Sequence, residues 1–258
     1  MKYNKYKLLK YCLIGFPFVA LTNGANGAEL GVGANFEHSI YYSKHKTMTS
    51  PFLALDLSFG NFYMRGAAGI SEIGYEQPFT DNFSVSLFVN PFDGFPIKGK
   101  DLLSGYQSIQ ERKTQFAFGW GLDYNLNGLF GWKDTFISME GKSGKRGASS
   151  NVTLAKSFEV TKDWTVTPYI GSSYYSSKYT DYYFGIKKSE LGRKLTAVYK
   201  PKEAYATHVG INTDYAFTDN FGMGLTVGWD KYSKEIKQSP IIKRDSQLTS
   251  SLSLYFIF

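Results

Sequence analysis

The segment LTSSLSLYFIF, residues 248–258, decides the fold. Its even-numbered positions are apolar except for Ser250, and its odd-numbered positions carry mostly hydroxyl groups. A period of two with one apolar face is typical of a β-strand. The alternation continues to Phe258, whereas the end of a soluble domain is usually polar and frayed. The segment therefore predicts a strand that needs an apolar environment along its whole length.

The first 28 residues have the three regions of a secretory signal peptide. Residues 1–10 carry four lysines and no acid, residues 11–21 are apolar, and residues 22–28 are small and polar. We expect cleavage after Ala28, with Gly27 as the alternative. A run of about 11 apolar residues is too short for a membrane-spanning helix, which needs roughly 20. The predicted organisation is a signal peptide over 1–28 and a single domain over 29–258.

The composition narrows the class of the mature chain. The single cysteine, Cys12, lies in the predicted signal peptide, so we expect no disulfide and no thiolate chemistry. Without the four signal lysines the formal charge falls from +7 to +3. Aromatic residues make up 17% of the chain, yet the mean hydropathy is −0.27. This combination excludes a helical membrane protein and favours an outer-membrane β-barrel, whose strands are apolar on one side only.

The same alternation recurs along the chain. In residues 220–230, NFGMGLTVGWD, and in residues 114–124, TQFAFGWGLDY, large apolar and small or polar side chains alternate. Short connections flanked by aromatic residues alternate with long loops rich in Lys, Gly and Ser. The long loops lie near 38–50, 92–111, 176–203 and 234–245. A soluble β-sandwich also alternates, but unequal connections at the two ends are typical of a transmembrane barrel.

We therefore predict an all-β, antiparallel outer-membrane barrel of about 12 strands with both termini in the periplasm. If residues 62–79 form one bent strand instead of a hairpin, the number falls to ten. The predicted strands cover 30–37, 51–59, 62–68, 72–79, 82–91, 112–124, 132–142, 149–159, 164–175, 204–217, 221–233 and 246–258.

No pattern of catalytic residues stands out. The chain has three histidines, His38, His45 and His208, and no Gly-x-Ser-x-Gly nucleophile elbow. The glycines of GVGANFE and GMGLTVG lie on strand faces and do not open a helix as a phosphate loop does. We expect a non-enzymatic protein with no cofactor, no metal and no nucleic-acid partner.

Inward-facing polar side chains form the first set of candidate residues. They suggest either a cation-preferring pore or a self-paired network around Arg65 that fills the lumen. These residues are Asn35, Glu37, Asp56, Arg65, Asp123, Glu140, Glu159, His208, Asp214 and Asp230.

Basic side chains form the second set, in the predicted outer loops. They favour attraction to lipopolysaccharide phosphates or to an anionic surface partner. These residues are Lys142, Lys145, Arg146, Lys187, Lys188, Arg193 and Lys194.

Several motifs, in order, resemble the MipA/OmpV family of outer-membrane proteins. They are LGVGANFEHSIYY, GNFYMRGAAGI, YYFGIKKSE followed by VYKP, and KEIKQSPII. The positions that match the family patterns are Glu37, His38, Arg65, Tyr182, Tyr183, Gly185, Ser189, Glu190, Tyr199, Pro201, Ser239 and Pro240.

This resemblance implies a scaffold that brings a lytic transglycosylase together with a bifunctional penicillin-binding protein during cell-wall growth. Other family members imply two alternatives, a small-solute channel and a surface adhesin that acts through the basic loops. The aromatic residues Tyr255, Phe256 and Phe258 resemble the C-terminal signature that the barrel assembly machinery recognises.

Overall fold

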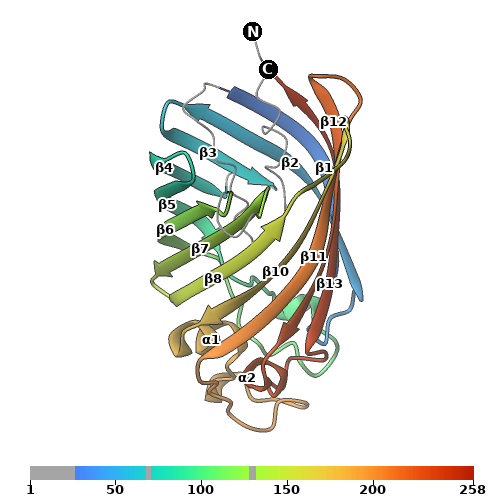
Figure 1. The fold of residues 1–258 in the computed structure, drawn as a ribbon. Coiled ribbons are helices and arrows are strands. Elements are labelled where there is room, and N and C mark those ends of the chain that lie inside the picture. The colour runs from blue at the N-terminus through green and yellow to red at the C-terminus, as the bar shows by residue number, and fades with distance from the viewer. Residues whose placement is uncertain (1–26, 68–70, 128–131) are drawn as a thin grey trace.

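The computed structural model describes residues 27–67, 71–127 and 132–258 (Figure 1). Most of the predicted signal peptide, residues 1–26, lies outside the described residues. The fold is one antiparallel sheet that closes on itself, because β13 pairs with β1 and β10 pairs with β11. Its strands are β1 (Gly27–His38), β2 (Thr47–Phe59), β3 (Phe62–Ala67), β4 (Glu72–Thr80), β5 (Phe83–Asp93), β6 (Gln115–Asn125), β7 (Thr135–Gly144), β8 (Gly147–Lys156), β9 (Phe158–Thr161), β10 (Trp164–Tyr175), β11 (Ala204–Ala216), β12 (Phe221–Tyr232) and β13 (Ser246–Ile257).

The thirteen segments form a 12-stranded barrel. Segments β8 and β9 both pair with β10, and only Ser157 separates them, so they are two parts of one strand. Residues 62–67 and 72–80 form two separate strands that pair with each other, which confirms twelve strands instead of ten.

The strand that opened the sequence argument closes the barrel. Glu29 lies opposite Ile257, and the register continues to Glu37 opposite Thr249. Leu252, Leu254 and Phe256 point outward and are exposed, whereas the odd-numbered Ser251, Ser253 and Tyr255 are buried inside. The apolar outer face suits lipid, and the polar inner face suits a lumen.

The two ends of the barrel differ. At one end, here called the turn rim, residues 60–61, 81–82 and 162–163 are short connections, and the C-terminus lies there too (Figure 1). At the other end, the loop rim, four long loops cover 39–46, 94–114, 176–203 and 233–245. These loops contain α1 (Ser177–Phe184), α2 (Lys234–Lys237) and two 3-10 turns, Gly99–Asp101 and Lys188–Glu190. Neither α-helix of the described chain has the length and apolar character needed to cross a bilayer.

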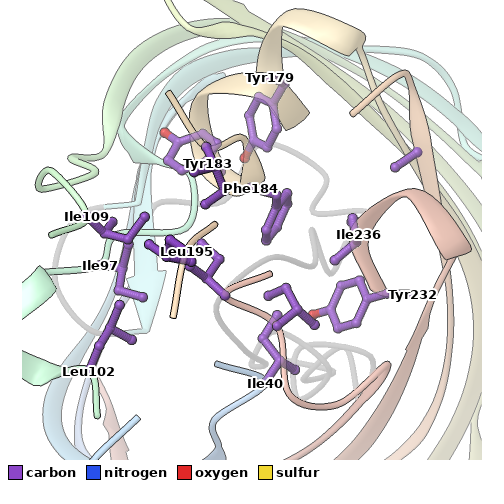
Figure 2. Close-up of a cluster of buried hydrophobic side chains, with 14 of the residues drawn as sticks. Ile40, Ile97, Leu102, Ile109, Tyr179, Tyr183, Phe184, Leu195, Tyr232 and Ile236 are labelled. Carbon is purple, nitrogen blue, oxygen red and sulfur yellow. The ribbon is translucent and has the colours of Figure 1, made fainter. Parts of the chain in front are cut away.

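Helix α1 is positioned by its N-cap. The Ser176 hydroxyl accepts a hydrogen bond from the Tyr179 amide, which satisfies one of the free N–H groups of the first turn. The helix turns Tyr179, Tyr183 and Phe184 toward the barrel interior, where all three are buried (Figure 2).

The buried apolar core lies at the loop rim. All four long loops contribute to it (Figure 2). Ala204 and Ala206 of β11 and Tyr232 of β12, at the loop-rim ends of these strands, belong to it as well. We call this assembly of the four loops the loop cap. Its fully buried loop side chains include Ile40, Leu102, Tyr183, Phe184, Ile186, Leu195, Ile236 and Ile241.

Two predicted strand boundaries are wrong for a physical reason. The strand expected from residue 112 begins at Gln115, because Arg112 pairs with Ile97 inside the loop 94–114. The strand expected over 132–142 runs from Thr135 to Gly144, so Lys142, grouped above with the outer loops, lies well inside the strand and not in a loop.

Deleting Phe258 tests the role of the terminal residue in closure. Its amide donates to the Ala28 carbonyl at 2.9 Å, and its ring packs on Phe256 with centroids 4.9 Å apart. We expect the deletion to remove about 1 kcal/mol of hydrogen-bond stabilisation and to lower the folding yield. Heat-modifiable migration of the refolded barrel in gels measures this yield. Phe258→Tyr is the matched control, and an unchanged yield for the deletion would contradict the assignment.

Candidate functional site: the loop cap and the lumen walls

A buried ion pair joins two loops of the cap. Arg112 in loop 94–114 binds Glu190 in loop 176–203 through two parallel contacts, Nη1 to Oε1 at 2.6 Å and Nη2 to Oε2 at 2.9 Å. Both side chains are almost fully buried, at 2% and 0% exposure. The second Arg112 nitrogen also donates to the Gly185 carbonyl at 3.0 Å. This planar fork fixes the two loops relative to each other.

Glu190 is fully bonded at this joint. Its carboxylate also accepts the backbone amides of Lys187 and Gln110, each at 2.9 Å. Burial raises the pKa of Glu190, but the hydrogen bonds from Arg112 and from these amides outweigh burial and hold it below its ordinary value of 4.5. The carboxylate therefore stays charged and paired near neutral pH.

Other positions from the family patterns also lie at contacts between loops. Ser239 Oγ donates to the Phe184 carbonyl at 2.6 Å, and Tyr199 Oη donates to the Glu235 carbonyl at 2.7 Å. Tyr183 Oη lies 3.2 Å from the Asp93 carbonyl. Gly94 passes so close to this hydroxyl, with φ of +125°, that no other residue fits there without strain.

The remaining positions that match the family patterns differ in burial and in location. Tyr182 accepts the Lys113 amide at 3.1 Å. Pro201 is buried, Pro240 is half-buried and Ser189 is exposed. His38 is the last residue of β1. The motifs of this chain therefore mark mainly the joints of the loop cap, and none of them is brought into a catalytic arrangement.

The structure places the residues of the predicted basic loop set in different surroundings. Lys142 points into the lumen from β7, where its Nζ lies 2.8 Å from Glu140 Oε1 and 3.7 Å from Asp93 Oδ1. Arg146, at the β7–β8 hairpin, stacks on the Tyr182 ring at 4.5 Å. The exposed basic residues of the set are Lys145, Lys187, Lys188, Arg193 and Lys194.

One half of the lumen carries ion pairs. Arg65 on β3 binds Glu72 on β4 at 3.2 Å, and Lys142 binds Glu140 on the same strand. Arg65 also stacks on Tyr63 at 4.0 Å. We call this region, β3 to β7, the paired wall. Asp56 and Asp123 are buried on or beside it, as predicted from their strand registers. Glu159 is instead exposed near the turn rim, in β9.

The other half, β11, β12, β13 and β1, is called the acidic wall. The remaining predicted lumen residues lie on this wall. They are Asn35, Glu37, His208, Asp214 and Asp230. Glu37 accepts a hydrogen bond from Gln247 at 2.5 Å, and Gln247 in turn accepts from Tyr232 at 2.7 Å. Among the described residues, no Lys or Arg nitrogen lies within 4.0 Å of the carboxylates of Glu37, Asp214 or Asp230.

The lumen gives no sign of a metal centre. Across the described ranges, no three His, Cys, Asp or Glu side chains converge in a way that could hold an ion. His208 lies 3.4 Å from Thr153 Oγ1, at the β8–β10–β11 side of the barrel. The polar lumen is therefore a surface of hydrogen-bonding groups and charges.

These features define the class of protein. A closed antiparallel barrel with apolar residues outside, polar residues inside and unequal rims is an integral protein of the bacterial outer membrane. A family model described as "MltA-interacting protein MipA" matches residues 30–258. The chain belongs to this MipA family.

The relatives of the chain agree with this class. The chain is 55% identical, over 99% of both sequences, to the "24 kDa outer membrane protein" of Pasteurella multocida. It is 23% identical to the "MltA-interacting protein" of Escherichia coli, over 93% of this chain and 94% of that protein. A NanC porin structure covers 88% of this chain and 98% of its own, with 10% identity and a TM-score of 0.49.

Replacing Arg112 tests the joint of the loop cap. Arg112→Met leaves Glu190 buried without its partner, which we expect to destabilise the cap by about 3–5 kcal/mol. The strands keep their pairing, so the barrel stays folded while the loops 94–114 and 176–203 become sensitive to protease. Limited proteolysis of the refolded barrel measures this change. Arg193→Met, at an exposed position of the same cap, is the control, and equal cleavage of the two variants would contradict the role of the ion pair.

Proposed function

We propose that this protein is a non-enzymatic outer-membrane scaffold that holds a lytic transglycosylase at the periplasmic face, together with a bifunctional penicillin-binding protein. The family and the name of the Escherichia coli relative support this proposal. In the proposed orientation, the turn rim and both termini face the periplasm, and the loop rim faces lipopolysaccharide.

One structural observation carries the proposal. The long loops turn their apolar side chains inward, and all four contribute to a single buried core. The loop rim thus uses its apolar side chains to cover its own end of the barrel. We therefore assign contact with a periplasmic enzyme to the turn rim.

The size of the turns limits the strength of this contact. The connections at 60–61, 81–82 and 162–163 are only two residues long. An interface built from such turns is expected to bury less than the roughly 1,200 Å² of a standard stable complex. The scaffold would therefore bind its enzymes weakly and gain from their shared confinement to the membrane surface.

Retention of a lytic transglycosylase on the immobilised barrel tests the scaffold function. We expect retention to fall when the turn-rim charges are reversed by Asp81→Lys and Asp219→Lys, because an exposed charge reversal weakens a small polar contact. The matched control reverses two loop-rim charges, Lys188→Glu and Arg193→Glu, and should retain the enzyme. Loss of retention only in the loop-rim variant would reject this orientation of the scaffold.

A second candidate function, conduction of small cations, is favoured by the acidic wall. Glu37, Asp214 and Asp230 face the lumen without a basic partner in the described chain. Carboxylates that line a lumen favour cations over anions.

Single-channel recording tests this second function. If the barrel conducts, we expect cation-selective steps in planar bilayers, and neutralising Asp123 and Asp214 together should lower the selectivity. Neutral exchange of an exposed loop residue, Lys188→Gln, is the control. Absence of conductance in the folded wild-type barrel would rule out the channel and leave the scaffold function unaffected.

A further inference from the structure

The acidic wall is built as a ladder of facing residues. Strand pairing places Asn212, Thr226, Ser251 and Asn35 in one row across β11, β12, β13 and β1. The next row toward the turn rim is Asp214, Gly224, Ser253 and Gly33. Toward the loop rim, Glu37 lies opposite Thr249, and Asp230 lies opposite His208. Since residues two apart share a face, these rows line one continuous inner surface.

Two amides on this surface are buried without hydrogen-bond partners. Asn35 and Asn212 are 4% and 2% exposed, and within the described chain neither the nitrogen nor the oxygen of either side chain has a partner. A buried polar group without a hydrogen-bond partner is costly. Each amide offers both a donor and an acceptor to whatever occupies the lumen beside it.

The two lumen walls also differ in their ion pairs. On the paired wall, Arg65 pairs with Glu72, and Lys142 lies within 4.0 Å of Glu140 and Asp93. On the acidic wall, Glu37, Asp214 and Asp230 have no such cation among the described residues. Carboxylates held inside a protein are expected to be paired, so this surface is complementary to a positively charged group from outside the chain.

Asp214 packs closely over a glycine of the neighbouring strand. A Cβ atom placed on Gly224 would meet Ser253 Oγ at 3.1 Å and Asp214 Oδ1 at 3.3 Å. The neighbouring wall residues Thr226, Ser251 and Ser253 are short and carry hydroxyl groups. The row between the flanking Asn212 and Asn35 is therefore made of short polar side chains across four strands.

We propose that the acidic wall binds a linear polyamine inside the lumen. One ammonium group would pair with Asp214 and a second with Glu37 or Asp230, while the amides and hydroxyls of the Asn212–Asn35 row hydrogen-bond the chain between them. With about 4.8 Å between strands and 3.3 Å per residue, these carboxylates are on the order of 15–20 Å apart along the wall. That spacing suits an extended chain with several amino groups.

The arrangement disfavours two other ligands. A divalent metal needs several oxygen ligands around one point, whereas these carboxylates are spread over different rows. An anionic solute would meet the carboxylates of this wall, and among the described residues no Lys or Arg nitrogen lies within 4.0 Å of Glu37, Asp214 or Asp230. The polyamine proposal is independent of the scaffold function, because it concerns the lumen and not the turn rim.

Calorimetric titration of the full folded barrel in detergent with spermine tests the site. We expect saturable binding of one spermine per barrel in the wild type. Asp214→Asn removes a charge-assisted contact, so we expect affinity to fall about tenfold or more. Asn212→Leu is expected to weaken binding in the same direction, because it replaces the amide by an apolar group and removes a donor and an acceptor.

Asp123→Asn is the matched control, because it neutralises a buried lumen acid on β6, outside the acidic wall. We expect it to change the affinity less than twofold. Equal losses for Asp123→Asn and Asp214→Asn would overturn the proposal in favour of general attraction to an acidic lumen. Absence of saturable binding, or equal displacement of spermine by millimolar Mg²⁺, would also overturn it. Heat-modifiable migration confirms that each variant is folded, and transglycosylase retention, measured separately, reports on the scaffold alone.

Discussion

The need to pair every backbone N–H and C=O group within lipid governs this structure. The sheet meets it by pairing its last strand with its first, from Glu29 opposite Ile257 to Glu37 opposite Thr249. Once the sheet is closed, each strand has one face in lipid and one in the lumen, so apolar and polar residues must alternate. The terminal segment is apolar on its even positions because it is one of these closing strands, and residues such as Leu252 and Phe256 face outward.

Closure with twelve strands creates a second requirement, since the interior is wider than the side chains of an eight-stranded barrel can fill. At the loop rim the chain fills it with its own loops, whose apolar side chains form a core that strands alone do not provide. A core made of irregular loops leaves few regular backbone hydrogen bonds, so side chains must hold the loops together. The Arg112–Glu190 fork, with the Gln110 and Lys187 amides on the same carboxylate, meets that need.

The barrel was easier to predict from the sequence than the loop cap. The strand pattern depends on neighbouring residues, whereas the contacts of the cap join residues far apart in the chain. A period of two is local, so twelve strands and the lumen positions of Asp214 and Asp230 could be assigned from short segments. Arg112 and Glu190 are 78 residues apart and each lies in a run of charged residues, which is typical of a solvated loop. Lys142 is the last residue of the strand predicted over 132–142, next to the lysine-rich hairpin, so grouping it with the loop lysines is wrong; alternation from Glu140 places it in the lumen.

The same constraint leaves the pairing of the inward residues open, so the two lumen walls can differ. Closure dictates that inward residues are polar but not how they are paired, and the choice of partner depends on which strands are neighbours. Arg65 on β3 reaches Glu72 because β3 and β4 are adjacent, and Lys142 shares a strand with Glu140. Strands β11, β12, β13 and β1 bring together acids, amides and hydroxyls without an inward Lys or Arg on these four strands. Since burying an unpaired carboxylate is costly, the proposed polyamine would supply the positive charge that these four strands do not provide.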